Sequence, residues 1–198
     1  MECLPRRALW AFALTGAVTG SLSGLFMMSS FALWGPGILM GLGLSILLDR
    51  NLRLWPGFES VLLVIATTFA FWVAIFAGFF AIDLLSFTPQ TWGQSVGFGA
   101  SAGLAGSLVI VLAVAVLSPV KLERWRLFRV VLLGGLLGIV HMLISATESI
   151  VPAEWFGIVA QVTACAVWQG GVATAIGWSV ACPAAYPAVC HERRPDPS

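Results

Sequence analysis

Few polar side chains in this sequence lie inside apolar stretches, and several of them gather around one histidine. His141 is the only histidine within an apolar segment, and Ser145 and Glu148 follow it at four and seven residues. This spacing places the three side chains on one face of a helix. Because ionisable groups inside a bilayer are costly, they point to a binding or transport function. The alternative is that His141 is a neutral, hydrogen-bonded packing residue.

Three further polar residues are predicted to lie on the outer side of the membrane, with Gln161 at a depth similar to that of His141. Gln161 belongs to the last apolar segment, Ser101 to the fourth, and Asp83 follows the third. We expect these residues to form an outward-opening polar pocket. The simpler alternative is that Asp83 and Glu148 face the outer water. The candidate ligand-binding residues are His141, Ser145, Glu148, Gln161, Ser101 and Asp83.

Other site chemistry is not indicated. The cysteines show no CxxC spacing, so free thiols are expected rather than a disulfide framework. A metal held by Cys182, Cys190 and His191 is disfavoured against the usual ligand spacings. No apolar segment contains a lysine, a second histidine or an acidic pair. We therefore expect neither a metal nor a cofactor. The four cysteines are Cys3, Cys165, Cys182 and Cys190.

Composition places the chain in a membrane. Of its 198 residues, 59% are hydrophobic and only 10% are charged, whereas soluble domains carry about 25% charged residues. The mean hydropathy is +0.96. A net charge of +1 without a basic stripe argues against nucleic acid as a partner.

Apolar segments near the ~20 residues needed to cross a bilayer recur along the chain. They predict an all-α integral membrane protein with six transmembrane helices in one bundle. The expected spans are residues 8–26, 31–48, 60–80, 96–117, 130–146 and 156–177, within a membrane domain at 1–182. Residues 183–198 are expected to form a disordered cytosolic tail. A cleaved signal peptide is the alternative for the first span, but no clear cleavage site follows it.

Charge asymmetry predicts the orientation. If the N-terminus is cytosolic, all ten Lys and Arg residues lie inside, while Asp83, Glu148 and Glu154 lie outside. Both termini are therefore predicted to be cytosolic, in the cytoplasmic (inner) membrane. The cluster from Lys121 to Arg129 is predicted to be a cytosolic loop. The expected topology anchors, which attract anionic lipids, are Arg6, Arg7, Arg50, Arg53, Lys121, Arg124, Arg126, Arg129, Arg193 and Arg194.

Tryptophan supports the same spans. Most of the tryptophans, Trp34 among them, fall near predicted boundaries, where an amphipathic ring is favoured. Only Trp72 and Trp168 are expected in the membrane interior.

Small residues recur at four-residue spacing within the spans. This spacing lets helix backbones approach closely, which is how spans associate in lipid. Packing within the chain is expected, with a homo-oligomer or a membrane-complex partner as the alternative. The rows are Gly16, Gly20 and Gly24; Gly37 and Gly41; Gly99 and Gly103; and Gly134 and Gly138.

Two halves of the chain share weak similarity. The stretch from Thr67 to Trp72 matches Thr163 to Trp168 at Thr, Ala and Trp. A 3+3 inverted repeat is one interpretation, and chance matching of small residues is the other. Inverted repeats are typical of transporters, which bind substrate near the midplane. In size and topology, the chain is similar to the six-span substrate-capture subunits of energy-coupling vitamin transporters.

One motif resembles an enzyme family. Gly99-Ala100-Ser101-Ala102 is similar to the GxSx motif of rhomboid intramembrane proteases, and this resemblance implies a nucleophilic Ser101. Rhomboids carry a histidine just before a glycine pair in their sixth span, but Trp168-Gln169-Gly170-Gly171 has none, and the HxxxN pattern of their second span is missing. We expect transport of a small molecule or ion, or membrane substrate binding. The alternatives are a non-catalytic subunit of a membrane complex and, more remotely, a rhomboid-like protease.

Overall fold

The computed structural model describes residues 6–27, 29, 31–52, 57–85, 92–117, 123–147 and 154–181. The prediction of an all-helical bundle is confirmed, because these residues form six long helices. The helices are α1 (Arg6–Phe26), α2 (Gly35–Leu52), α3 (Gly57–Leu85), α4 (Trp92–Leu117), α5 (Arg124–Ala146) and α6 (Glu154–Ala181).

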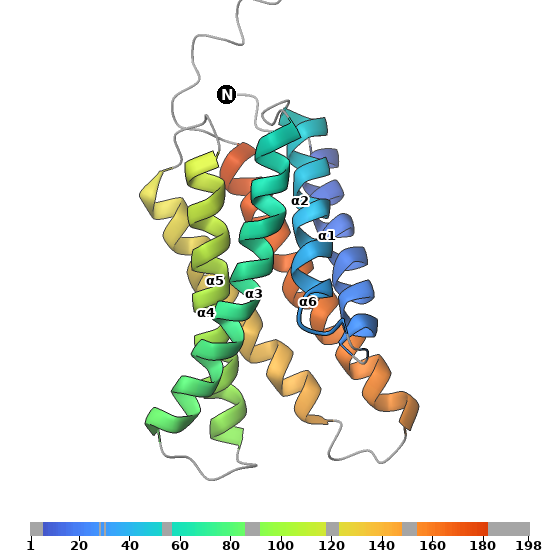
Figure 1. Cartoon of the computed structure of the whole chain (residues 1–198), viewed down its shortest axis with the longest axis vertical. Coiled ribbons are helices and arrows are strands. Elements are labelled where there is room, and N and C mark those ends of the chain that lie inside the picture. Colours follow the sequence, from blue (N-terminus) through green and yellow to red (C-terminus); the bar gives the residue numbers. More distant parts are fainter. Residues whose placement is uncertain are drawn as a thin grey trace, which may run out of the picture.

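The helices form a closed ring. Each helix packs against the next one in the chain, and α1 also packs against α6. Successive helices run in opposite directions, so the start of α1 and the end of α6 lie at the same end of the bundle (Figure 1). We call this the terminal end and the other the distal end.

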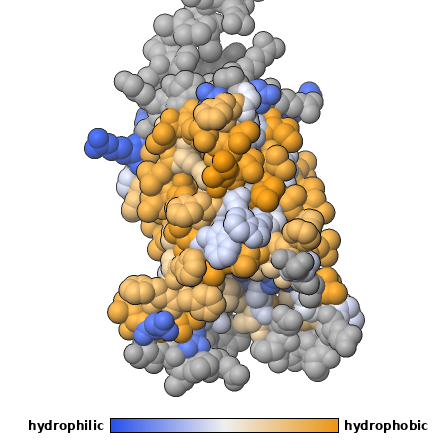
Figure 2. Space-filling model, in the orientation of Figure 1, coloured by the Kyte–Doolittle hydropathy of each residue, from blue (hydrophilic) through white to orange (hydrophobic). Residues whose placement is uncertain are grey.

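The outer surface of the bundle is apolar. Five helices, α1, α3, α4, α5 and α6, are long and apolar enough to cross a membrane, while α2 contains a shorter apolar stretch, Gly35–Asp49. Large hydrophobic side chains point outward, including Val116, which is 81% exposed, and Leu84, which is 71% exposed. Figure 2 shows this apolar surface between hydrophilic residues near the two ends. Such a surface is suited to lipid, and it indicates a multi-pass membrane protein.

The predicted loop from Lys121 to Arg129 is wrong for its second part, because α5 already begins at Arg124. Arginine and leucine are good helix formers, and long arginine side chains can extend from a helix end toward the headgroups. Glu123 precedes the helix in an extended conformation, and its Oε2 atom lies 2.9 Å from Nε of Arg126. Lys121 lies outside the described residues.

The α1–α2 hairpin ends well short of the distal end (Figure 1). The ring of Trp34, just before α2, lies 5.4 Å from the ring of Trp72, halfway along α3. The two rings therefore share one depth, contrary to the prediction that placed Trp34 at a boundary and Trp72 in the interior. From Trp72, α3 continues to Leu85, about 20 Å further at 1.5 Å per residue. The distal end is therefore built from α3, α4, α5 and α6.

Glycine rows lie where helices meet. A Cβ atom on Gly103 of α4 would come closer than 3.0 Å to the carbonyl oxygen of Gly134 on α5. A Cβ on Gly99 would meet the backbone of Gly138 in the same way. The row on α1 faces α6, and the row on α2 faces Val64, Thr67 and Thr68 of α3. Each of these rows lies against another helix of the same chain.

The hydrophobic core is concentrated toward the terminal end. Phe12, Leu48 and Val172 are each 0% exposed and belong to one cluster. Toward the distal end, the buried apolar side chains are smaller, such as Ala160 and Ala164. The terminal half is thus filled by large side chains, and the distal half is packed mainly through small ones.

Candidate functional site

Two of the predicted pocket residues meet at the distal end. Ser145 lies near the end of α5 and Gln161 near the start of α6, so the antiparallel pairing of these helices brings them together. The hydroxyl of Ser145 donates a hydrogen bond to Oε1 of Gln161 over 3.3 Å. Both side chains are half-buried.

His141 lies one turn deeper on α5 and contacts the same neighbouring helix. Its imidazole ring lies near the backbone of Ala164 on α6. The amide nitrogen of Gln161 donates to Sγ of Cys165 over 3.7 Å. We call His141, Ser145, Gln161 and Cys165 the α5–α6 polar cluster. Cys165 was not predicted to belong to the site, although its position four residues after Gln161 places it on the same helix face.

The other predicted pocket residues are not joined to this cluster by hydrogen bonds in the described part of the chain. The hydroxyl of Ser101 donates to its own helix, to the carbonyls of Gly97 at 2.7 Å and Phe98 at 3.1 Å. A serine within a helix is commonly satisfied by the preceding turn in this way. Asp83 is exposed in the last turn of α3, and Glu148 lies outside the described residues. A Ser101–His141 catalytic pair, as an intramembrane protease would need, has no hydrogen bond in the described structure.

The distal part of α5 is only loosely covered. From His141 to Thr147 every residue is half-buried, whereas the earlier turns alternate between buried glycines and exposed leucines. A helix end that is partly exposed on all sides leaves its polar side chains reachable. The α5–α6 polar cluster therefore combines hydrogen-bonding groups with partial exposure of His141, Ser145 and Gln161, while Cys165 is buried.

A second buried polar contact lies nearer the middle of the bundle. Nε2 of Gln169 on α6 donates to Oγ of Ser23 on α1 over 2.8 Å and approaches the carbonyl of Pro36 on α2 at 3.5 Å. Nearby, the hydroxyl of Thr67 on α3 donates to the carbonyl of Gly37 over 2.9 Å. Oε1 of Gln169 has no hydrogen-bond partner. Because Gln169 is only 3% exposed, these contacts hold helices together and do not form an accessible site.

No group of three His, Cys, Asp or Glu side chains suited to a metal ion occurs within the ranges that the structure describes. Cys182, Cys190 and His191 lie outside those ranges.

Similarity to known proteins gives no indication of function, so the functional argument rests on the polar cluster. No protein-family model, curated protein or solved structure matches this chain.

Proposed function

We propose that this multi-pass membrane protein binds or translocates a small polar molecule through the α5–α6 polar cluster. The observation that carries the proposal is the Ser145–Gln161 hydrogen bond between two spans, with His141 one turn deeper. Polar side chains inside spans are costly and favour a functional role over simple packing.

The chemistry of the cluster suits a neutral, hydrogen-bonding ligand. Serine, glutamine and neutral histidine each offer both a donor and an acceptor. None of them carries a permanent charge. A sugar, polyol, amide or nucleoside would match these groups better than a strongly charged ion.

The Ser145–Gln161 bond is well suited to exchange with a ligand. At 3.3 Å it is longer than the ~2.7 Å typical of hydroxyl donors. A long bond is weak, so replacing it with bonds to a ligand costs little. The ligand would then take the place of a contact between α5 and α6.

The proposed direction of access follows from the charges. Basic residues at the terminal end favour a cytosolic location for that end, which would turn the distal end outward. The short α1–α2 hairpin leaves α3 to α6 alone at this end (Figure 1). We infer that the ligand enters from the outer aqueous phase. The inverted repeat suggested by the sequence would fit a translocator, and substrate binding alone requires only the cluster.

The test compares Gln161→Leu with Thr163→Val. Thr163 is exposed on the same helix two residues away and lies outside the cluster. Thr163→Val therefore removes a polar group from α6 without changing the cluster. Each protein is placed in nanodiscs and dialysed against a defined mixture of neutral polyols, amides and nucleosides. Bound compounds are then measured by mass spectrometry.

We expect at least one compound to be retained by the wild type and by Thr163→Val. Its affinity should fall by roughly 2- to 10-fold in Gln161→Leu, the effect of one lost hydrogen bond. His141→Ala should lower it as well. Equal retention by Gln161→Leu and the wild type would refute the proposal that the α5–α6 polar cluster binds the ligand. Retention of no compound by any folded form would favour a non-catalytic partner subunit instead.

A further inference from the structure

A groove opens on the side of the bundle between α1, α5 and α6. It has a volume of about 660 Å³, within the ~300–1,000 Å³ of typical small-ligand sites. Ala13 and Ala17 of α1, Leu133 of α5, and Val167 and Gly170 of α6 belong to its walls. These walls are apolar and made largely of small residues.

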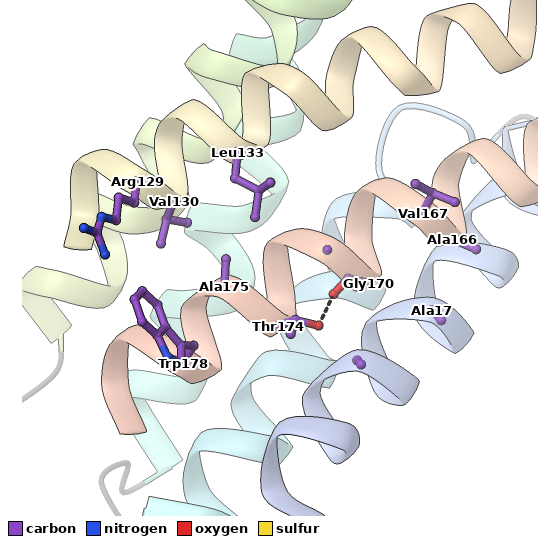
Figure 3. A pocket seen from close by; sticks show the side chains of 12 residues that line it. Ala17, Arg129, Val130, Leu133, Ala166, Val167, Gly170, Thr174, Ala175 and Trp178 are labelled. Carbon is purple, nitrogen blue, oxygen red and sulfur yellow. Dashed lines mark hydrogen bonds between the residues drawn. The ribbon is translucent and has the colours of Figure 1, made fainter. Parts of the chain in front are cut away.

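One end of the groove carries a positive charge. Arg129 of α5 and Trp178 of α6 face each other there (Figure 3). The guanidinium carbon of Arg129 lies 5.3 Å from the ring centre of Trp125 and 6.0 Å from that of Trp178. Contacts of this kind between a cation and an aromatic ring are attractive, so the two rings hold the guanidinium at the mouth of the groove. Arg126 lies 5.9 Å from the same Trp178 ring, but its charge is paired with Glu123 at 2.9 Å, so Arg129 supplies the charge of this end.

The length of the groove matches one leaflet. Along α6 it extends from Trp178 to Ala166, about 18 Å at 1.5 Å per residue. Half of the hydrocarbon core is about 15 Å thick. Tryptophan and arginine are favoured at the headgroup level, which is where this geometry places the charged end.

We propose that the groove is a binding site for one anionic phospholipid. The phosphate lies against Arg129, and an acyl chain runs along the apolar walls toward Val167. A cationic end joined to an apolar channel of leaflet length fits an amphiphile, whereas a free phosphate would leave the channel unused. The charged end of this site lies at the terminal end of the bundle, opposite the α5–α6 polar cluster at the distal end, and the proposal does not depend on that cluster.

The decisive comparison is Arg129→Gln against Arg124→Gln. Both remove one positive charge from the start of α5, but Arg124 does not belong to the groove. The proteins are reconstituted in nanodiscs of phosphatidylglycerol and phosphatidylcholine at a 1:3 ratio, and the lipids retained after release are counted by native mass spectrometry. We expect the wild type and Arg124→Gln to prefer phosphatidylglycerol by about fivefold, the effect of one basic residue at an anionic surface. Arg129→Gln should lose this preference.

Two further variants separate the roles of charge and channel. Arg129→Lys keeps the charge, so its preference for phosphatidylglycerol should persist. Because this variant shows that position 129 tolerates substitution, a lost preference in Arg129→Gln can be assigned to the lost charge. Val167→Trp fills the apolar end at a partly exposed position and should lower the number of retained lipids of both kinds. Equal loss of preference in Arg124→Gln and Arg129→Gln would show general attraction to the surface and overturn the site. So would retention that Val167→Trp leaves unchanged, or the absence of any preference in the wild type.

Discussion

The close approach of α4 and α5 makes Gly103→Ala a sharp test of how this bundle is held together. A Cβ atom at Gly103 would lie closer than 3.0 Å to the carbonyl oxygen of Gly134 and about 3.0–3.1 Å from further backbone atoms of Gly134 and Gly135. Backbone cannot move aside as a flexible side chain can, so the two helices must separate. Overpacking of this kind costs about 1–3 kcal/mol, and the upper part of that range applies when backbone is the obstacle.

A compensating gain comes from helix propensity. Alanine favours a helix over glycine by up to about 1 kcal/mol. The net effect of Gly103→Ala on the free energy of unfolding should therefore be a loss of roughly 1–2 kcal/mol. Because the cost is steric and local to α4 and α5, the far-UV circular dichroism of the folded state should not change.

Two matched glycines provide the controls. At Gly170 the nearest atom to an added Cβ is the backbone nitrogen of Ala17, at 3.3 Å, and at Gly57 nothing lies within 4 Å. Gly170→Ala should be close to neutral, and Gly57→Ala neutral or slightly stabilising. Stability would be followed by tryptophan fluorescence during denaturation by sodium dodecyl sulfate in mixed micelles. If Gly103→Ala proved as stable as the other two variants, the backbone contact between α4 and α5 would not exist in the protein.

Two further predictions address topology and the middle of the bundle. In a chain whose native cysteines are replaced, a membrane-impermeant maleimide should label Asp83→Cys in intact cells and Arg124→Cys only after permeabilisation; the reverse pattern would refute the inferred orientation. Gln169→Leu should stay within about 0.6 kcal/mol of the wild type in unfolding free energy, because it removes the unpartnered Oε1 atom together with the Ser23 bond, of about that average strength, and the longer contact with Pro36. Gln169→Ala leaves a cavity instead and should cost about 2 kcal/mol or more, so equal losses in the two variants would contradict the assigned packing role.

The helices themselves were readable from the sequence because hydrocarbon demands long apolar runs. Their ends were less so. The predicted spans 60–80 and 96–117 correspond to α3 at Gly57–Leu85 and α4 at Trp92–Leu117, which include additional turns. Helical hydrogen bonding continues into the polar turns, since leaving a backbone group unsatisfied near lipid is costly. Hydropathy measures only the apolar part of each helix.

The position of the α1–α2 hairpin along the bundle axis could not be predicted from the hydropathy pattern. Trp34 follows an apolar run in a way typical of a membrane boundary, yet its ring contacts Trp72 in the middle of α3. Apolar length cannot reveal such an offset, because it shows how long each helix is but not how neighbouring helices slide past each other. That sliding is decided by which side chains interlock, such as Thr67 of α3 against Gly37 and Gly41 of α2.

The candidate site was partly accessible from spacing. His141 and Ser145 were placed on one helix face by their four-residue separation, and Gln161 was matched to them by depth. The sequence does not predict which group the Ser101 hydroxyl bonds to. A local acceptor, the carbonyl of Gly97, competes with any partner on another helix. The lipid groove was hidden for a related reason. Its walls come from three helices, and only Arg129 stands out in the sequence.

The contacts of α5 indicate where this bundle can open. On one side, Gly138 lies against the backbone of Gly99 in α4, and separating that pair would forfeit close contacts between backbones. On the other side, the distal turns of α5 meet α6 through the 3.3 Å Ser145–Gln161 bond, which hydrogen bonds to a polar ligand could replace. If the proposed site binds a ligand, α6 together with the α1 helix packed against it would have to move away from the α4–α5 pair to open the cluster. The large side chains of the terminal half would act as the fixed end of that movement.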